Sequence, residues 1–257
     1  MKTNHIHNAT LIAFLSLSIS CGGNNNIPVE EMVEVPGGEF MMGCNTAFDA
    51  DCRADEFPYH RVTVPPFKID RYEVMLGAFK KCIDAGVCIQ GAACINNPAG
   101  WDFHPVNCAS WEQARTYCAW RGKRLPSEAE WELAARGTDG RKYPWGNSEL
   151  VSEHAVVFFG DCTQQVGSKP IGASPYGAMD MIGNVWEWVE DDYHSNFNGA
   201  PANGAPWICT PDRCPERVMK SGDCFSYGEG NDHRISRRFP KSPDASTWTV
   251  EGFRCAK

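Results

Sequence analysis

The sequence predicts an α+β domain in which turns outweigh helices and strands and disulfides hold the chain together. Its 257 residues include 24 glycines and 17 prolines, which interrupt short alternating segments such as "HRVTV", "FKID" and "GEFMMG". Helical patterns are few, and there are 13 cysteines. A hydrophobic content of 42% with 22% charged residues is typical of a folded domain with one large core.

Residues 1–20 have the features of a secretory signal peptide. The segment "LIAFLSLSIS" supplies about ten apolar or small residues, which is the length of a signal-peptide core and too short to span a bilayer. Ser18 and Ser20 precede Cys21 as in a bacterial lipobox, with Leu17 one place earlier than usual. We therefore expect an exported lipoprotein of the bacterial envelope, periplasmic or at the cell surface, with Cys21 lipidated. Secretion without an anchor is the alternative.

One domain is expected after this leader. Residues 21–31 are polar and glycine-rich, as in a tether between the lipid on Cys21 and the fold. No second linker, repeat or low-complexity tract interrupts residues 32–257, which we assign to one domain. A net charge of −8 without a long basic run argues against nucleic acid as a partner. The membrane is an expected partner through the lipid anchor.

The cysteine count favours disulfides over metal binding. With Cys21 lipidated, 12 cysteines remain, an even number that could pair completely. Their spacings are irregular and no C-x-x-C occurs, whereas zinc sites use short paired spacings. A small local disulfide explains the cysteines of "CTPDRC", Cys209 and Cys214. Cys44 and Cys52 are also expected in disulfides.

Three segments show helical patterns, and two of them begin with a capping box. The first, over 73–86, places apolar residues on one side and ends at a glycine. In the second and third, over 110–122 and 127–137, a serine and the Gln or Glu three positions later satisfy each other's backbone groups. The residues carrying these patterns are Phe79, Cys82, Ile83, Ser110, Trp111, Gln113, Ala114, Cys118, Ser127 and Glu130.

Six motifs in fixed order resemble the sulfatase-modifying-factor family, the formylglycine-generating enzymes and their relatives. The resemblance covers roughly residues 32–257 and implies a C-type-lectin-like α+β fold with little regular secondary structure. The motifs are "VEVPGGEFMMG", "IDRYEV", "HPVNCASWEQARTYCAWRGKRLPSEAEWELAARG", "YPWGN", "YGAMDMIGNVWEW" and "EGFRC". Tryptophans within them are expected to build core, and Arg124, Glu128 and Glu130 to form ion pairs or caps.

The resemblance implies a calcium site in "MDMIGNVWEW". A carboxylate before a tight Gly-Asn turn can offer hard oxygen ligands, which calcium prefers. The family's ligands map onto the side chain of Asp180 and the backbone oxygens of Met181, Gly183 and Val185. The alternative is that Asp180 caps a turn in which Asn184 is left-handed.

The family's copper site is not matched. Formylglycine-generating enzymes follow a Gly-rich turn with two cysteines that hold copper(I), because soft thiolates suit that ion. Here the turn is "KSGD", and Ser226 and Asn231 occupy the two cysteine positions. Cys224 lies nearby without a partner at the family's spacing. Copper is therefore not expected, and any catalytic group near this degenerate turn is unassigned.

The resemblance also implies a bond between Cys118 and Cys255. Family members with both cysteines bridge the terminal strand to this helix. Cys118 shares a helix face with Trp111 and Ala114, and Cys255 shares a strand face with Phe253. The pair would close a loop of about 137 residues, worth on the order of 5 kcal/mol in chain entropy.

Three functions follow for comparison. The first is a binding or divergent catalytic module without copper, whose groove takes a peptide, protein or glycan and is lined by Tyr227, His233, Arg234 and Arg237. The second is an oxidase that converts a sulfatase cysteine to formylglycine, which needs Cys224 or Cys209 to reach the copper position. Calcium-dependent glycan binding ranks lowest, because the sequence lacks the "EPN", "QPD" and "WND" signals of C-type lectins.

Overall fold

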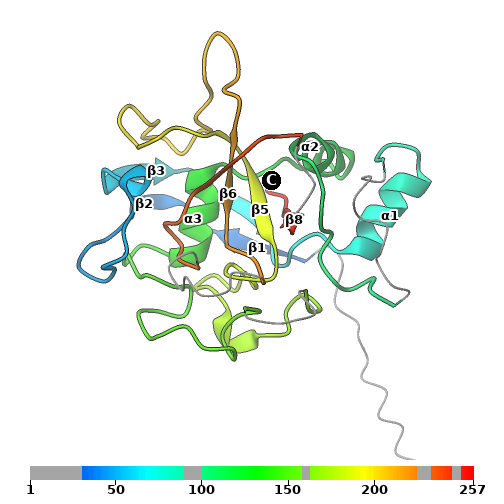
Figure 1. The fold of residues 1–257 in the computed structure, drawn as a ribbon, viewed down its shortest axis with the longest axis horizontal. Helices are drawn as coiled ribbons and strands as arrows, with labels where there is room; N and C mark the ends of the chain where they lie inside the picture. The colour runs from blue at the N-terminus through cyan, green and yellow to red at the C-terminus, as the bar shows by residue number, and fades with distance from the viewer. Residues whose placement is uncertain (1–30, 90–99, 158–162, 225–232, 245–249) are drawn as a thin grey trace, which may run out of the picture.

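The computed structural model describes residues 31–89, 100–157, 163–224, 233–244 and 250–257, and it has the expected α+β architecture with long turns between short elements (Figure 1). Among these residues, no helix has the length and apolar composition needed to cross a bilayer. The helices are α1 (Leu76–Asp84), α2 (Trp111–Trp120) and α3 (Glu128–Arg136), with 3-10 turns at Ala54–Glu56 and Pro170–Gly172. The strands are β1 (Met32–Val35), β2 (Gly38–Met42), β3 (His60–Val64), β4 (Phe67–Asp70), β5 (Trp186–Asp192), β6 (Arg217–Lys220), β7 (Phe239–Lys241) and β8 (Glu251–Gly252).

The central sheet has the order β7-β6-β5-β8, in which only β8 runs parallel to its neighbour. Two antiparallel pairs, β1 with β4 and β2 with β3, lie beside it. Figure 1 shows β5 and β6 crossing the middle of the molecule, with α3 on one side and α2 and α1 on the other. The two larger core clusters follow this division: one gathers around α3 and Trp131, the other around α1, α2 and Trp188. A small third cluster joins Val156, Val185, Cys224 and Val250.

Both predicted capping boxes form. The Ser110 hydroxyl accepts the backbone N–H of Gln113 at 3.2 Å, and the Gln113 side chain accepts the Ser110 N–H at 2.9 Å. Ser127 and Glu130 make the same reciprocal pair at the start of α3, and Gly137 ends that helix at a φ of 71°. The helix ends were therefore predictable from local sequence alone.

Four disulfides join described cysteines: Cys44–Cys52, Cys82–Cys88, Cys118–Cys255 and Cys209–Cys214. The expected bond between Cys118 and Cys255 is present, with their Cα atoms 5.6 Å apart. The short Cys82–Cys88 loop after α1 is a pair that the sequence did not assign. Cys21 lies outside the described residues.

The last residues of the chain complete structures formed far earlier in the sequence. The backbone N–H groups of Lys68 and Asp70 in β4 donate to the carbonyls of Lys257 and Cys255 at 2.9 and 2.8 Å. Ala256 also exchanges backbone bonds with Arg124, just before α3. The C-terminal segment thus joins β4 to the connection between α2 and α3.

Candidate functional site

The turn after β6, residues 220–224, lies where the resemblance places the family's metal-binding turn. Ser221 and Gly222 have φ values of 89° and 94°, and a positive φ is uncommon for a residue other than glycine. The Ser221 hydroxyl donates to the carbonyl of Gly183 at 3.1 Å and so ties this turn to the Asp180 turn. Cys224 is fully buried and disulfide-bonded. It therefore offers no thiolate to a metal in this state.

Buried ion pairs surround the start of this turn. The Nζ of Lys220 lies 3.4 Å from a Glu128 oxygen and 3.2 Å from a Glu132 oxygen, and all three side chains are buried. Arg238 binds both Glu128 oxygens, at 2.8 and 3.0 Å. Burial alone would raise the pKa of Glu128, but Arg238 and Lys220 together hold it below its usual value. Glu128 consequently acts as part of a neutralised network, as its structural interpretation predicted.

Arg234 belongs to a second buried network. Its guanidinium lies 2.6 Å from an oxygen of Glu56 and 2.9 Å from an oxygen of Asp49. His233 is equally buried, and its Nε2 lies 2.6 Å from the carbonyl oxygen of Asp223. Burying a guanidinium away from water is costly unless well-aligned carboxylates bind it. The two short contacts of Arg234 with Glu56 and Asp49 meet this condition.

These positions correct one expectation from the sequence. His233, Arg234 and Arg237 expose 0%, 0% and 5% of their surfaces, so their side chains lie in the interior and not on the wall of an open groove. Because Arg234 is buried and paired with two carboxylates, its role is to stabilise the fold. Tyr227, Ser226 and Asn231 lie outside the described residues.

The Asp180 turn has the left-handed Asn184 of the turn alternative, and Asp180 is left-handed as well, which the sequence did not predict. Asp180 and Asn184 are left-handed, with φ values of 55° and 61°. One oxygen of Asp180 accepts the N–H of Gly167 at 2.5 Å, and the Asn184 amide donates to Glu73 at 2.7 Å. Both side chains are buried, so these contacts fix the turn from within.

Three buried carboxylates meet one guanidinium behind this turn. Arg254 binds both oxygens of Glu187 at 2.7 Å and donates to the carbonyl of Met179 at 2.9 Å. Burial raises the pKa of Asp180 to about 6, against the opposing effects of the Gly167 N–H and Arg254. Burial, Asp180 and Glu187 raise the pKa of Glu73 well above its usual value. Acidic groups thus outnumber the cation in this cluster.

The chemistry of these groups fits calcium. A carboxylate and backbone carbonyls are hard oxygen ligands, and a divalent cation would offset the excess of buried carboxylates. Asp180 would supply its side chain, and Met181, Gly183 and Val185 their backbone oxygens. The carbonyl of Gly183 already accepts a hydrogen bond from the Ser221 hydroxyl. An ion bound to this carbonyl would therefore lie beside the turn after β6.

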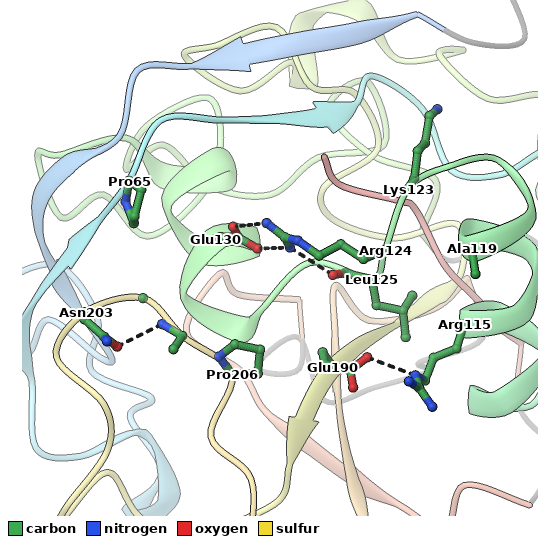
Figure 2. Close-up of a pocket in the computed structure, with 12 residues that line it drawn as sticks. Pro65, Arg115, Ala119, Lys123, Arg124, Leu125, Glu130, Glu190, Asn203 and Pro206 are labelled. Carbon is green, nitrogen blue, oxygen red and sulfur yellow. Dashed lines mark hydrogen bonds and ion pairs between the residues drawn. The ribbon is translucent and has the colours of Figure 1, made fainter.

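A surface pocket of about 600 Å³ lies between α2, the start of α3 and residues 203–206 (Figure 2). Its walls carry both signs of charge. The guanidinium of Arg124 donates to both carboxylate oxygens of Glu130 at 2.6 Å, and that of Arg115 lies 3.4 Å from a Glu190 oxygen. Burial raises the pKa of Glu190 against the attraction of Arg115. The remaining lining residues are Pro65, Ala119, Lys123, Leu125, Asn203, Gly204, Ala205 and Pro206.

The sequence did not single out Arg115 or Glu190. Arg115 lies on the solvent side of α2, where charged residues are ordinary, and Glu190 follows a buried strand segment. Only the fold brings them to one pocket, so no local pattern marked them.

Comparisons with known proteins place this fold and site in context. The model of the sulfatase-modifying factor enzyme 1-like domain matches residues 20–257. The protein named serine/threonine-protein kinase Pkn1 from Chlamydia trachomatis is 35% identical over 246 residues, which cover 88% of this chain but only 38% of that protein. The inactive C-alpha-formylglycine-generating enzyme 2 of Bos taurus is 31% identical over 88% of this chain and 87% of its own length.

Relatives named as active enzymes match as well. The formylglycine-generating enzyme of Thermomonospora curvata is 32% identical over 88% of this chain and 92% of its own length. The solved structure of PvdO from Pseudomonas aeruginosa superposes with a TM-score of 0.76 at 30% identity, covering 88% of this chain and 94% of that one. Proteins of this architecture thus carry the names of both an active enzyme and an inactive one.

Proposed function

Because the chain belongs to the sulfatase-modifying factor enzyme 1-like family, we propose that it is a member that binds a partner and lacks copper-dependent oxidase activity. The proposal includes export and a lipid anchor on Cys21, with the domain held at the envelope. Four disulfides among the described residues support an oxidising compartment.

The state of two cysteines carries the proposal. Copper(I) in a cysteine pair needs two thiolates, and the family's positions hold Ser226 and Asn231. The two cysteines that could substitute from nearby, Cys224 and Cys209, are both disulfide-bonded. The surrounding charges are neutralised in buried pairs, which suits a scaffold better than a reacting centre.

An oxidase assay tests this proposal. The disulfide-intact protein is titrated with copper(I) and incubated with a sulfatase-derived cysteine peptide, with the Thermomonospora curvata enzyme as positive control. We expect no stoichiometric copper binding and no aldehyde on the peptide. Aldehyde formation would establish the alternative, a formylglycine-generating oxidase that matures sulfatases.

The pocket of Figure 2 is the candidate binding surface, and a peptide is its proposed ligand. Guanidinium and carboxylate groups of Arg115, Arg124, Glu130 and Glu190 stand close together around an apolar floor that includes Leu125. A peptide carries both charge signs and apolar side chains at this spacing, whereas a neutral glycan does not.

A blocking substitution tests the surface. Ala119 is exposed at the pocket, and Ala47 is exposed in a distant loop, so Ala119→Trp and Ala47→Trp form a matched pair. Each variant and the wild type are probed with a peptide library and a glycan array. We expect peptide binding by the wild type and Ala47→Trp that Ala119→Trp loses. Glycan binding alone, calcium-dependent or not, or peptide binding that survives Ala119→Trp would refute this assignment.

Calcium at the Asp180 turn belongs to the same proposal as a structural ion. It would neutralise part of the buried acidic cluster and hold the Asp180 turn against Ser221. No chemical step is assigned to it.

A further inference from the structure

A second group of metal-ligating side chains lies away from both turns described above. His194 follows β5, and Cys209 and Cys214 close a short loop before β6. One imidazole nitrogen and the two sulfur atoms all lie within 4.8 Å of one another. All three residues are half-buried, and among the described disulfides this is the pair with both cysteines open to solvent. We call these residues the His-Cys-Cys cluster.

The histidine is held as a metal ligand would be. Nδ1 of His194 lies 3.0 Å from the backbone carbonyl of Asp192, and a carbonyl only accepts, so Nδ1 carries the proton. In the neutral ring Nε2 then presents its lone pair, and it lies 3.4 Å from the Cys209 sulfur. Trp207 stacks on the ring at 3.6 Å between centroids, which fixes its plane. In metal-binding histidines the ring nitrogen that does not bind the metal typically donates its N–H to such a carbonyl.

The loop is positioned by contacts other than its disulfide. The backbone N–H groups of Cys209 and Cys214 both donate to one carboxylate oxygen of Asp192, at 2.9 and 3.3 Å. The other oxygen of Asp192 pairs with Arg213 and Arg217, at 3.0 and 2.8 Å. Because these contacts hold both cysteine backbones, opening the sulfur–sulfur bond leaves the two thiols facing His194.

We propose that the His-Cys-Cys cluster binds a thiophilic divalent ion of the zinc type once the Cys209–Cys214 disulfide is reduced. A tetrahedral zinc with bonds of about 2.3 Å to sulfur and about 2.0 Å to nitrogen sets sulfur–sulfur and sulfur–nitrogen distances of roughly 3.7 and 3.5 Å. The existing contact between Nε2 and the Cys209 sulfur already has the second length. The two sulfurs must move apart after reduction, and the Cys214 sulfur, which already lies within 4.8 Å of Nε2, must reach the same distance of roughly 3.5 Å. The fourth position stays open.

The reaction balances with a dithiol reductant. The reductant gives two electrons and two protons to the disulfide, becomes a cyclic disulfide itself, and leaves two protein thiols. The metal then displaces the two thiol protons and binds both thiolates and the imidazole. In the oxidised protein the sulfurs are bonded to each other, so the cluster has no thiolate to offer. Metal affinity is thereby gated by redox state.

The other cluster with cysteines and acids does not share this design. Cys44, Cys52, Asp49 and Glu56 also lie close together, but the guanidinium of Arg234 contacts both carboxylates. The guanidinium already neutralises the two carboxylates that would otherwise attract a metal ion. Of these two cysteine-containing clusters, we therefore assign metal binding to the His-Cys-Cys cluster.

Cobalt(II) is the probe for the test, since thiolate–cobalt bonds give intense charge-transfer absorption. The full chain is reduced mildly with a dithiol, and mass spectrometry checks that the Cys209–Cys214 disulfide is lost. Cobalt(II) is then titrated and afterwards displaced with zinc(II). We expect one equivalent to bind the reduced protein with a thiolate band and none to bind the oxidised protein. Circular dichroism verifies that the reduced protein stays folded.

Three variants complete the design. His194→Asn should weaken cobalt affinity at least roughly tenfold, since even outer-shell partners of metal ligands are worth that much. His154→Asn is the matched control, because His154 is also half-buried and stacked on a tryptophan, and it should change nothing. The double change Cys209→Ser with Cys214→Ser should abolish the thiolate band while the fold survives. An unchanged band in that variant, no band in the reduced wild type, or unfolding on reduction of this disulfide would each overturn the proposal.

Discussion

Removing the Cys118–Cys255 bond tests how much of the stability comes from closing the chain. The two residues are separated by 137 positions, and both are fully buried. The change is the double substitution Cys118→Ala and Cys255→Ala. Its matched reference is Cys82→Ala with Cys88→Ala, which removes a bond between residues only 6 positions apart that are also buried.

The expected magnitudes follow from loop length. Chain entropy assigns about 5 kcal/mol to a 137-residue loop and about 2 kcal/mol to a 6-residue loop. Both variants lose two buried sulfurs, so their cavity costs largely cancel in the comparison. The long loop should therefore cost about 3 kcal/mol more of the free energy of unfolding than the short one. A typical domain has a free energy of unfolding of about 5 to 15 kcal/mol. A loss of about 5 kcal/mol would therefore leave the Cys118→Ala, Cys255→Ala variant only marginally folded.

Urea unfolding followed by tryptophan fluorescence measures both free energies. Equal losses in the two variants, or a larger loss for the Cys82–Cys88 pair, would refute the entropic reasoning. If the Cys118 variant is already unfolded without urea, its titration is repeated in sucrose, which strengthens the folded state equally for both variants.

The remaining predictions concern charge, metal and lipid. EDTA should lower the melting temperature of the wild type by several degrees and leave that of Asp180→Ala unchanged, and an unaffected wild type would reduce the site to a turn. Without calcium, the pKa of Asp180 is about 6 in the folded state and 3.8 in the unfolded state, so the folded state binds the proton more tightly. The free energy of unfolding should therefore fall by about 3 kcal/mol as pH rises from about 4 to 6. This fall should vanish in Asp180→Asn. Arg254→Met removes the cation bound to Glu187 and should cost about 3 to 5 kcal/mol in urea unfolding, because both side chains of that pair are buried. Arg124→Met should cost less than about 1 kcal/mol, because the Arg124 side chain is half-exposed and water can replace it beside Glu130. Mass spectrometry of the mature N-terminus from a bacterial host should find a lipid on Cys21, and an unmodified cysteine there would count against the anchor.

Local signals predicted the local structure well. The helix starts at Ser110 and Ser127 follow from side chains three positions apart, and the left-handed Asn184 follows from its Gly-Asn turn. Strand pairing was not accessible in this way. β8 is two residues long and pairs in parallel with β5, which lies more than sixty positions earlier, so no local pattern marks it.

The site was predictable only where chemistry is local. The local pair Cys209–Cys214 could be expected from its spacing, but the placement of His194 against it could not. The charged residues after the β6 turn were interpreted as ligand-facing, because a sequence does not show where an arginine's partners are. For Arg234 they are Asp49 and Glu56, which lie 185 and 178 positions earlier. When the acidic partners of an arginine are this far away in the sequence, its surrounding residues resemble those of an exposed basic patch.

The C-terminal backbone bonds have a consequence for biosynthesis. The residues of β1 to β4 have been synthesised when less than a third of the 257 residues have been made, yet β4 receives its outer partners, Cys255 and Lys257, only after the other described elements have been made. Until then one edge of β4 has open backbone groups, and Cys118 awaits its partner. The nascent chain must therefore be kept from pairing with other strands or thiols until residues 255–257 have emerged, so this part of the fold closes only after the other described elements. Chains truncated before residue 255 lack these backbone bonds and the Cys118–Cys255 disulfide, and they should accordingly be cleaved faster by proteases.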